Sequence, residues 1–154
     1  MIAYTHLKML SKWDRRFIEM ANHIAAWSKG PRTRVGAVIV RPDRSIASLG
    51  YNGPPRGFDD EAFLNMPREE QHKFVIHAEI NAIAQAHRDE DLSTCTLYVS
   101  PMLPCKDCAQ DVVSTGIRRV VAYCGHMSQD WIESAKEANR IFANNAVEFL
   151  FSME

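Results

Sequence analysis

Apolar and polar residues are distributed along the chain with two different periods. Over residues 11–28 the apolar side chains recur every three or four positions, which is typical of an amphipathic helix. Residues 35–40 and Ile46–Tyr51 are short apolar runs, separated by a turn that contains Pro42. We therefore predict a first helix followed by an antiparallel hairpin.

The second half of the chain repeats a helix and a strand three times. The pattern predicts helices over residues 77–87, 105–115 and 129–142, and strands over residues 96–99, 118–123 and 147–151. Between the hairpin and these repeats lie a Gly/Pro-rich loop, 52–57, and a polar, acidic segment, 59–73, for which only a short helix over 68–73 is predicted. This order predicts an α/β fold, a mixed sheet with helices on both faces.

Length, composition and charge limit the function classes. The chain has 154 residues, 46% of them hydrophobic, which fits a single domain over 1–154 with its own core. Its net charge of −1 provides no broad basic surface, so we expect no nucleic-acid partner. Without a signal peptide or a long apolar run, the sequence predicts a cytoplasmic protein with no membrane partner.

Four cysteines add candidate chemistry. Cys105 and Cys108 form a Cys-x-x-Cys pair, whereas Cys95 and Cys124 stand alone. A chain of this size without secretion signals keeps its thiols reduced, so a disulfide framework is not expected. The close pair therefore indicates metal binding or redox chemistry.

A histidine and a glutamate upstream of this pair indicate which chemistry it is. His77-Ala78-Glu79 precedes Pro104-Cys105-Lys106-Asp107-Cys108, and both segments begin predicted helices. One imidazole and two thiolates are zinc ligands, and three protein ligands with an open fourth position are typical of a catalytic zinc. The combination is similar to the His-x-Glu and Pro-Cys-x-x-Cys signature of zinc deaminases that act on nucleobases.

The pattern also assigns a role to each of these residues. Thiolates in the first turn of a helix are stabilised by the helix dipole. A water on the fourth zinc position has its pKa lowered to about 7 and can attack a ring carbon of the base. Glu79, close by but not a ligand, is then expected to move protons from this water to the ring nitrogen and to the leaving ammonia.

Other interpretations of the same residues remain open. If Cys95 or Cys124 supplied a fourth ligand, the zinc would be structural and would leave no room for water. A redox role for the Cys-x-x-Cys pair would leave His77 and Glu79 unexplained. A zinc-stabilised binding module without catalysis is a third alternative.

With these residues in hand, the chain resembles the cytidine deaminase superfamily, most closely its deoxycytidylate deaminases. Residues 28–29, 33–40 and 50–57 are similar to the first two strands of that family and the loop after them. The resemblance implies a three-layer sandwich, with a five-stranded mixed sheet between helices. It also implies zinc-dependent hydrolysis of dCMP to dUMP and ammonia, and a homohexamer.

The resemblance implies further site residues beyond the metal ligands. Basic and hydroxyl groups before the first strand would bind the phosphate, and an asparagine would bind the sugar. The candidate substrate-binding residues are Ser28, Lys29, Arg32, Arg34, Asn52, Ala78 and Tyr123. The basic cluster could equally be a solvated turn, and Tyr123 an ordinary strand aromatic. Allosteric control by dCTP and dTTP, with Mg²⁺ accompanying the triphosphate, would involve Asn52, Gly53 and Arg56.

One departure from the family pattern widens the choice of substrate. The link between the predicted strand at 96–99 and Cys105 is one residue longer than usual, with Pro101 added. Because this link forms part of the base pocket wall in the family, a 5-substituted dCMP remains an alternative substrate. A tRNA or other nucleic-acid base is a further alternative, although the predicted helix over 129–142 is not basic.

Overall fold

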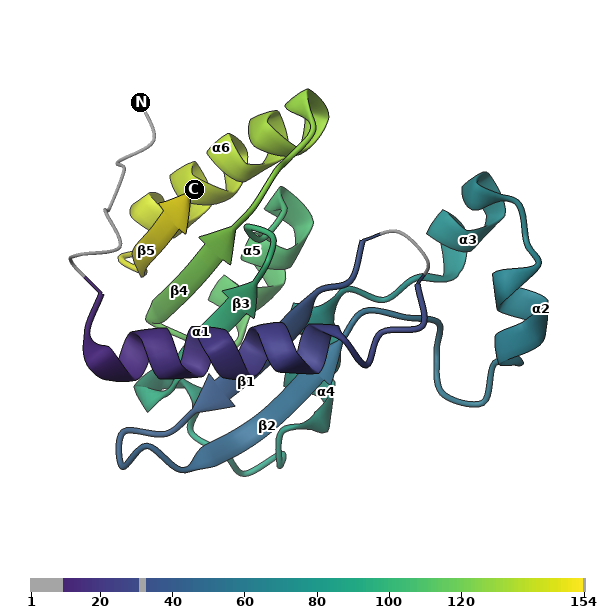
Figure 1. Ribbon diagram of the computed structural model, residues 1–154. Coiled ribbons are helices and arrows are strands. Elements are labelled where there is room, and N and C mark those ends of the chain that lie inside the picture. The colour runs from purple at the N-terminus through teal and green to yellow at the C-terminus, as the bar shows by residue number, and fades with distance from the viewer. Residues whose placement is uncertain (1–9, 31–32, 154) are drawn as a thin grey trace.

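The computed structural model describes residues 10–30 and 33–153, which form a five-stranded sheet covered by helices (Figure 1). The strands lie in the order β2-β1-β3-β4-β5. Their bounds are β1 Gly36–Val40, β2 Ile46–Tyr51, β3 Thr96–Ser100, β4 Arg119–Cys124 and β5 Glu148–Met153. β1 pairs antiparallel with β2 and β3, whereas β3, β4 and β5 run parallel. The predicted α/β fold with a mixed sheet is confirmed.

The helices form two layers on opposite faces of the sheet. α1 (Lys12–Ala25) crosses one face, and α4 (Ala78–Gln85), α5 (Lys106–Ser114) and α6 (Gln129–Asn144) cover the other (Figure 1). A 3₁₀ turn, η2 (Leu92–Thr94), leads into β3. The predicted three-layer sandwich is confirmed.

Helix α1 begins where the sequence predicts and ends earlier. Ser11 is its N-cap, and the Ser11 hydroxyl accepts a hydrogen bond from the Asp14 amide. The Asp14 carboxylate in turn accepts one from the Ser11 amide, which completes a capping box. The helix stops at Ala25, so Trp27 lies beyond it and is 52% exposed. The predicted extension to residue 28 is therefore wrong.

Two glycines allow helices to lie directly on the strands. A Cβ at Gly36 in β1 would lie 2.0 Å from the Ala21 carbonyl oxygen of α1, and one at Gly50 in β2 would lie 2.4 Å from the Ala82 amide nitrogen of α4. Any larger residue there would displace a helix backbone. The small size of Gly50 therefore sets the distance between α4 and β2. Helix α4 begins directly after His77.

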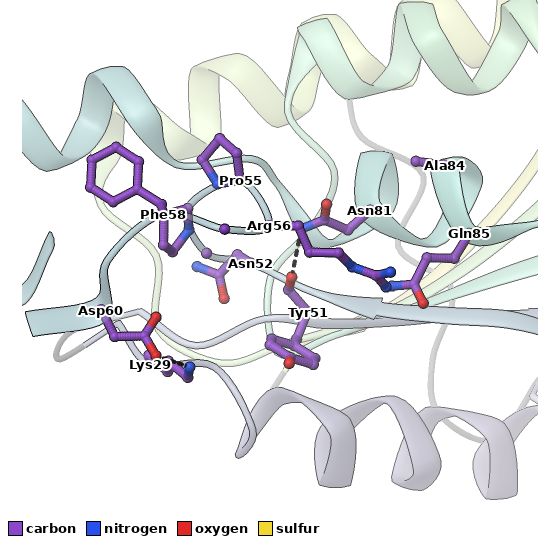
Figure 2. Close-up of a pocket in the computed structure, with 13 residues that line it drawn as sticks. Lys29, Tyr51, Asn52, Pro55, Arg56, Phe58, Asp60, Asn81, Ala84 and Gln85 are labelled. Carbon is purple, nitrogen blue, oxygen red and sulfur yellow. Dashed lines mark hydrogen bonds and ion pairs between the residues drawn. The ribbon is translucent and has the colours of Figure 1, made fainter.

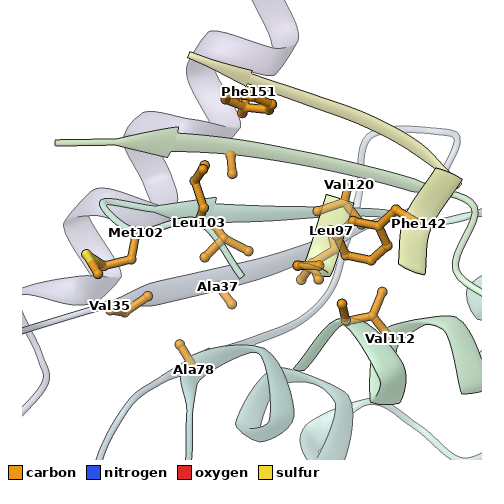
Figure 3. Close-up of a cluster of buried hydrophobic side chains, with 14 of the residues drawn as sticks. Val35, Ala37, Ala78, Leu97, Met102, Leu103, Val112, Val120, Phe142 and Phe151 are labelled. Atoms are coloured by element: carbon orange, nitrogen blue, oxygen red, sulfur yellow. The ribbon is translucent and has the colours of Figure 1, made fainter. Parts of the chain in front are cut away.

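The larger core lies between the sheet and the α4, α5 and α6 layer (Figure 3). It is built from alternate strand residues such as Leu97 and Val120, packed against Val112 of α5 and Phe142 of α6. All four side chains are completely buried. This core holds the first turns of α4 and α5 in fixed positions against the sheet.

The opposite face buries charge as well as apolar groups. Asp14 of α1 is 4% exposed and accepts hydrogen bonds from both Nη atoms of Arg119, at 2.8 and 2.9 Å, and from the Tyr98 hydroxyl at 2.8 Å. Arg119 also bonds Glu148 at 3.1 Å. This network ties α1 to β3, β4 and β5.

A short arm carries two helices away from the sheet (Figure 1). α2 (Asp60–Leu64) begins at the N-cap Asp59, and α3 (Arg68–Phe74) follows Pro67. α2 was not predicted, whereas α3 lies close to its predicted bounds. Within the described ranges, no helix is long and apolar enough to cross a membrane.

Candidate metal centre and active site

Three side chains that could hold a metal ion meet between α4 and α5. His77 is the N-cap of α4, Cys105 is the N-cap of α5, and Cys108 lies in the first turn of α5. His77 Nδ1 is 3.2 Å from Cys108 Sγ and 3.5 Å from Cys105 Sγ. The three ligand atoms all lie within 4.8 Å of one another. The structure thus brings together the three residues that the sequence predicts as ligands.

The group fits zinc in donor type and spacing. Zinc in proteins takes nitrogen and sulfur ligands at about 2.0–2.3 Å, so neighbouring ligand atoms lie roughly 3–4 Å apart. Both thiols are buried, and the Cys108 amide points to Cys105 Sγ at 3.4 Å. Negative charge on these sulfurs is favoured by the amide groups at the start of α5.

The titration behaviour of the group is that of thiols and an imidazole sharing protons. The hydrogen bond from Cys108 lowers the pKa of Cys105 to about 4, and the same bond raises the pKa of Cys108. The pKa of His77 is raised, chiefly by its hydrogen bond to Cys105. Zinc is bound by thiolates, so metal binding at this position would release the protons of both thiols.

The two other cysteines lie elsewhere. Cys95 Sγ donates to the Asp91 carbonyl at 3.5 Å, and Cys124 Sγ donates to the Gly125 carbonyl at 2.9 Å. Neither belongs to the His77 group. The described residues therefore provide three ligands, which is the number typical of a catalytic zinc.

Glu79 lies beside the group without being part of it. Its carboxylate is 3% exposed, and Oε2 is 3.8 Å from Cys108 Sγ. Burial raises the pKa of Glu79, which makes the carboxyl group a stronger proton acceptor once it is ionised. A buried carboxylate two residues after His77, in the first turn of α4, is suited to hold and release a proton.

The group opens into a cleft of about 720 Å³. Its floor is formed by the first turn of α4, and its walls come from the segment before β1, from α3, from the loop after β3 and from the start of α6. The lining includes Thr33, Arg34, Asn52, Arg68, His72, His77, Ala78, Glu79, Pro101, Met102, His126 and Trp131.

The predicted phosphate cluster is divided by the structure. Arg34 lines the cleft. The Ser28 side chain is 3% exposed and donates to the Asn52 carbonyl at 2.7 Å, so it braces the loop. Lys29 forms an ion pair with Asp60 and lines a different pocket. Arg32 lies outside the described residues.

The remaining predicted substrate residues also differ in position. Asn52 lines the cleft and joins two segments, since its Oδ1 accepts from the Val35 amide at 2.9 Å and its Nδ2 donates to the Thr33 carbonyl at 2.8 Å. Ala78 is buried at the cleft floor. Tyr123 packs with the residues on the α1 face and is not part of the cleft lining.

A second pocket, of about 700 Å³, is lined by the 52–57 loop and by one face of α4 (Figure 2). Asn52 lines both pockets, and Gly53 and Arg56 line this one. Figure 2 shows the Arg56 side chain extending toward Gln85, away from the Lys29 and Asp60 pair. The three predicted effector residues therefore share one pocket.

The structure adds lining residues that the sequence pattern did not single out. The Trp131 ring lies 6.0 Å from the His77 ring, and its Nε1 donates to the Leu103 carbonyl at 2.9 Å. Arg68 and His72 reach the cleft from α3. An isolated tryptophan near the start of an amphipathic helix carries no sequence signal for such a role.

Comparison with known proteins identifies relatives of the chain. A family model described as the cytidine and deoxycytidylate deaminase zinc-binding region matches residues 11–124. An uncharacterized deaminase of Aliivibrio fischeri is 40% identical over 144 residues, which cover 91% of this chain and 93% of the relative. A probable deoxycytidylate deaminase of Caenorhabditis elegans is 41% identical over 112 residues, covering 71% of this chain and 56% of the relative.

Solved structures show the same architecture. The dCMP deaminase of cyanophage S-TIM5, solved in complex with dCMP and dUMP, superposes with a TM-score of 0.72 at 25% sequence identity. The match covers 93% of this chain and 98% of the phage protein.

A further relative by sequence is the human deoxycytidylate deaminase. It is 35% identical over 116 residues, which cover 71% of this chain and 64% of the human protein.

Proposed function

Because the chain belongs to the cytidine and deoxycytidylate deaminase family and is a deaminase of that family, we propose that it hydrolyses dCMP to dUMP and ammonia. The observation that carries the proposal is the placement of Glu79 beside the His77, Cys105 and Cys108 group at the floor of one cleft. The likeness to a phage enzyme solved with dCMP and dUMP supports the choice of substrate.

The residues of the chain divide the work of this reaction. His77, Cys105 and Cys108 would hold zinc, which when bound acts as a Lewis acid that activates water near neutral pH. As the water oxygen adds to carbon 4, Glu79 takes a water proton and passes it to ring nitrogen 3. Glu79 then takes the second water proton from the new hydroxyl on carbon 4 and delivers it to the amino group; the carbonyl forms as the bond between carbon and nitrogen breaks and ammonia leaves.

Burial of Glu79 serves both transfers. A carboxyl group with a raised pKa gives up its proton less readily than a solvated one, so it can hold the proton between the two steps. Glu79 is 3% exposed, so little of the residue is in contact with bulk water. His77 immediately precedes the first turn of α4, on which Glu79 lies.

A dCMP that carries a substituent at carbon 5 is the second candidate substrate. Pro101 and Met102, from the lengthened link after β3, both line the cleft. A longer link changes the wall of the pocket and with it the room beside the base. A free nucleotide remains the better candidate than a nucleic acid, because the chain has a net charge of −1.

Further parts of the proposal concern regulation, assembly and location. We expect dCTP, with Mg²⁺, and dTTP to bind in the second pocket, where Gly53 and Arg56 lie. Asn52 lines this pocket and the cleft and so provides a physical link between them. We also propose that residues 1–154 form one deaminase domain, which assembles as a homohexamer in the cytoplasm.

An ammonia-release assay on zinc-loaded protein tests the proposal. The substrates are dCMP, 5-methyl-dCMP, deoxycytidine, dCTP and a cytosine-containing single-stranded oligonucleotide. We expect the highest kcat/KM for dCMP, an increase with added dCTP and a decrease with added dTTP. A preference for 5-methyl-dCMP would favour the second candidate. No turnover of any free nucleotide by protein with one zinc per chain would overturn the proposal.

A further inference from the structure

Helix α3 contributes an arginine and a histidine to the cleft. Arg68 and His72 are four residues apart, so they project from the same face of the helix. Both line the cleft, and Arg68 Nε donates a hydrogen bond to His72 Nε2 at 3.3 Å. This bond uses one of the five N–H groups of the guanidinium and leaves the four terminal ones for another acceptor.

Arg34, from the segment before β1, is held in a similar way. Its Nε donates to the Gly30 carbonyl at 3.1 Å, which again leaves the terminal N–H groups for a ligand. Within the described part of the chain, neither Arg34 nor Arg68 forms an ion pair with a carboxylate. Two arginines therefore line one cleft, and no described carboxylate pairs with their terminal N–H groups.

The charge of the cleft as a whole favours an anion. Glu79 is the one carboxylate among its described lining residues, and it lies at the metal group. The other charged side chains of the lining are the two arginines, Arg34 and Arg68, although the whole chain has a net charge of −1. Guanidinium groups bind phosphate oxygens through paired hydrogen bonds, which suits them to a phosphate monoester.

The other basic candidate is occupied elsewhere. Lys29 is paired with Asp60, and the hydrogen bond from this pairing raises the pKa of Lys29. It lines the second pocket rather than the cleft. Lys29 was predicted to bind the phosphate together with Arg34, because the two are close in sequence. In the structure Arg68, which is distant from Arg34 in sequence, lies on the cleft wall instead.

We propose that Arg34 and Arg68 bind the 5′-phosphate of the nucleotide from two walls of the cleft, with His72 as the positioning residue for Arg68. The inference rests on the proposed function, since it assigns the phosphate subsite of the same reaction. It makes α3 a determinant of the preference for a nucleotide over a nucleoside. The phosphate would also hold α3 against the body of the domain.

The test compares Arg68→Ala with wild type on dCMP and deoxycytidine. A charge-assisted hydrogen bond contributes enough that the ratio of kcat/KM for dCMP to that for deoxycytidine is expected to fall about 10- to 100-fold. Calorimetry should show a matching loss of affinity for dUMP relative to deoxyuridine. The matched control is Lys73→Ala, on the same helix but paired with Glu70 at 2.8 Å and outside the cleft lining, which should change neither ratio.

His72→Phe separates positioning from general damage to α3. It should raise KM for dCMP several-fold with kcat unchanged, and it should add little when combined with Arg68→Ala because both act on one contact. An equal loss on dCMP and deoxycytidine in Arg68→Ala would overturn the inference, as would no loss on either.

The outcomes also distinguish phosphate binding by Arg34 and Arg68 from the proposed deamination of dCMP. If wild type turns over dCMP and Arg68→Ala keeps the full dCMP preference, the phosphate assignment fails and the function stands. If wild type deaminates no nucleotide yet binds dUMP, and Arg68→Ala weakens that binding, the function fails and the phosphate subsite stands.

Discussion

Two buried carboxylates, one on each side of the sheet, have opposite chemistry. Asp14 is 4% exposed and Glu79 is 3% exposed. Burial alone would raise the pKa of Asp14, but hydrogen bonds from Arg119 and Tyr98 and the charge of Arg119 together lower it to about 2. Among the described residues Glu79 has no guanidinium partner, and burial raises its pKa.

The difference shows that the partner, rather than burial, decides what a buried acid does. Asp14 is ionised at neutral pH and holds α1 to the sheet, so its role is structural. Glu79 is left able to gain and lose a proton, so its role is chemical. Changing either residue should therefore affect one property and spare the other.

The largest expected effect comes from removing a metal ligand. In Cys108→Ser the group loses a sulfur ligand, so we expect zinc content to fall well below one per chain and deamination to fall to background. Metal analysis and ammonia release measure both. Cys95→Ser is the matched control, because this buried thiol lies outside the group and should leave one zinc per chain.

Glu79→Gln should separate catalysis from folding. Loss of the proton acceptor is expected to lower kcat about 10²- to 10⁴-fold, while zinc content stays at one per chain. The Tm should not fall, because the change removes an ionisable group that burial disfavours in its charged form. A variant that kept wild-type kcat would show that Glu79 is not the proton carrier.

Asp14→Asn should have the converse effect. It leaves Arg119 without its buried partner, and we expect unfolding free energy to drop by about 2–3 kcal/mol. This is below the usual cost of breaking a buried pair because the Arg119 side chain is 29% exposed. Urea denaturation measures the loss. Activity per folded molecule should be unchanged, and a selective loss of kcat would blur the contrast with Glu79.

The effect of Asp14 on stability should depend on pH in a defined direction. Its pKa is about 2 in the fold and about 3.9 in an unfolded chain. Because the folded value is the lower, the ionised group stabilises the fold above about pH 4, and this contribution is lost as the pH falls toward 2. The difference in stability between wild type and Asp14→Asn should shrink over that window, as followed by denaturation of the two proteins in parallel.

The smallest expected effect concerns Trp131. Trp131→Phe keeps a ring beside His77 but removes the hydrogen bond to the Leu103 carbonyl, so we expect kcat/KM to fall by only a few-fold. A wild-type value would show that the bond does not support the cleft wall. Trp13→Phe, on the α1 face, is the matched control and should leave kcat/KM unchanged.

Most of the fold follows from sequence pattern because its helices and strands are amphipathic or uniformly apolar. The exceptions have local causes. Helix α1 stops short of Trp27 although the apolar spacing continues. α2 escaped prediction because five mostly acidic and apolar residues show no period. Its capping signal, Asp59 bonded to the Ala62 amide at 2.7 Å, is visible only once the helix is known.

The site was predictable where chemistry depends on short spacing and not where it depends on distant contacts. His77, Glu79, Cys105 and Cys108 lie on two helix starts, and their spacing carries the signal. By contrast, the pairing of Lys29 with Asp60 could not be inferred from the run of basic residues before β1. The same holds for the approach of Arg68 and Trp131 to the cleft, since tertiary packing alone brings them there.

The missing side chain at Gly50 has a consequence for how this protein tolerates change. In a survey of all single substitutions, position 50 should be as intolerant as the metal ligands, although it takes no part in the chemistry. Its Cβ would lie 2.4 Å from the Ala82 amide nitrogen, so even alanine would push α4 from the hairpin and move His77 with it. Substitution at position 50 is limited by side-chain volume alone. Restoring activity to a variant with a larger residue there would require the removal of atoms, not the addition of a functional group.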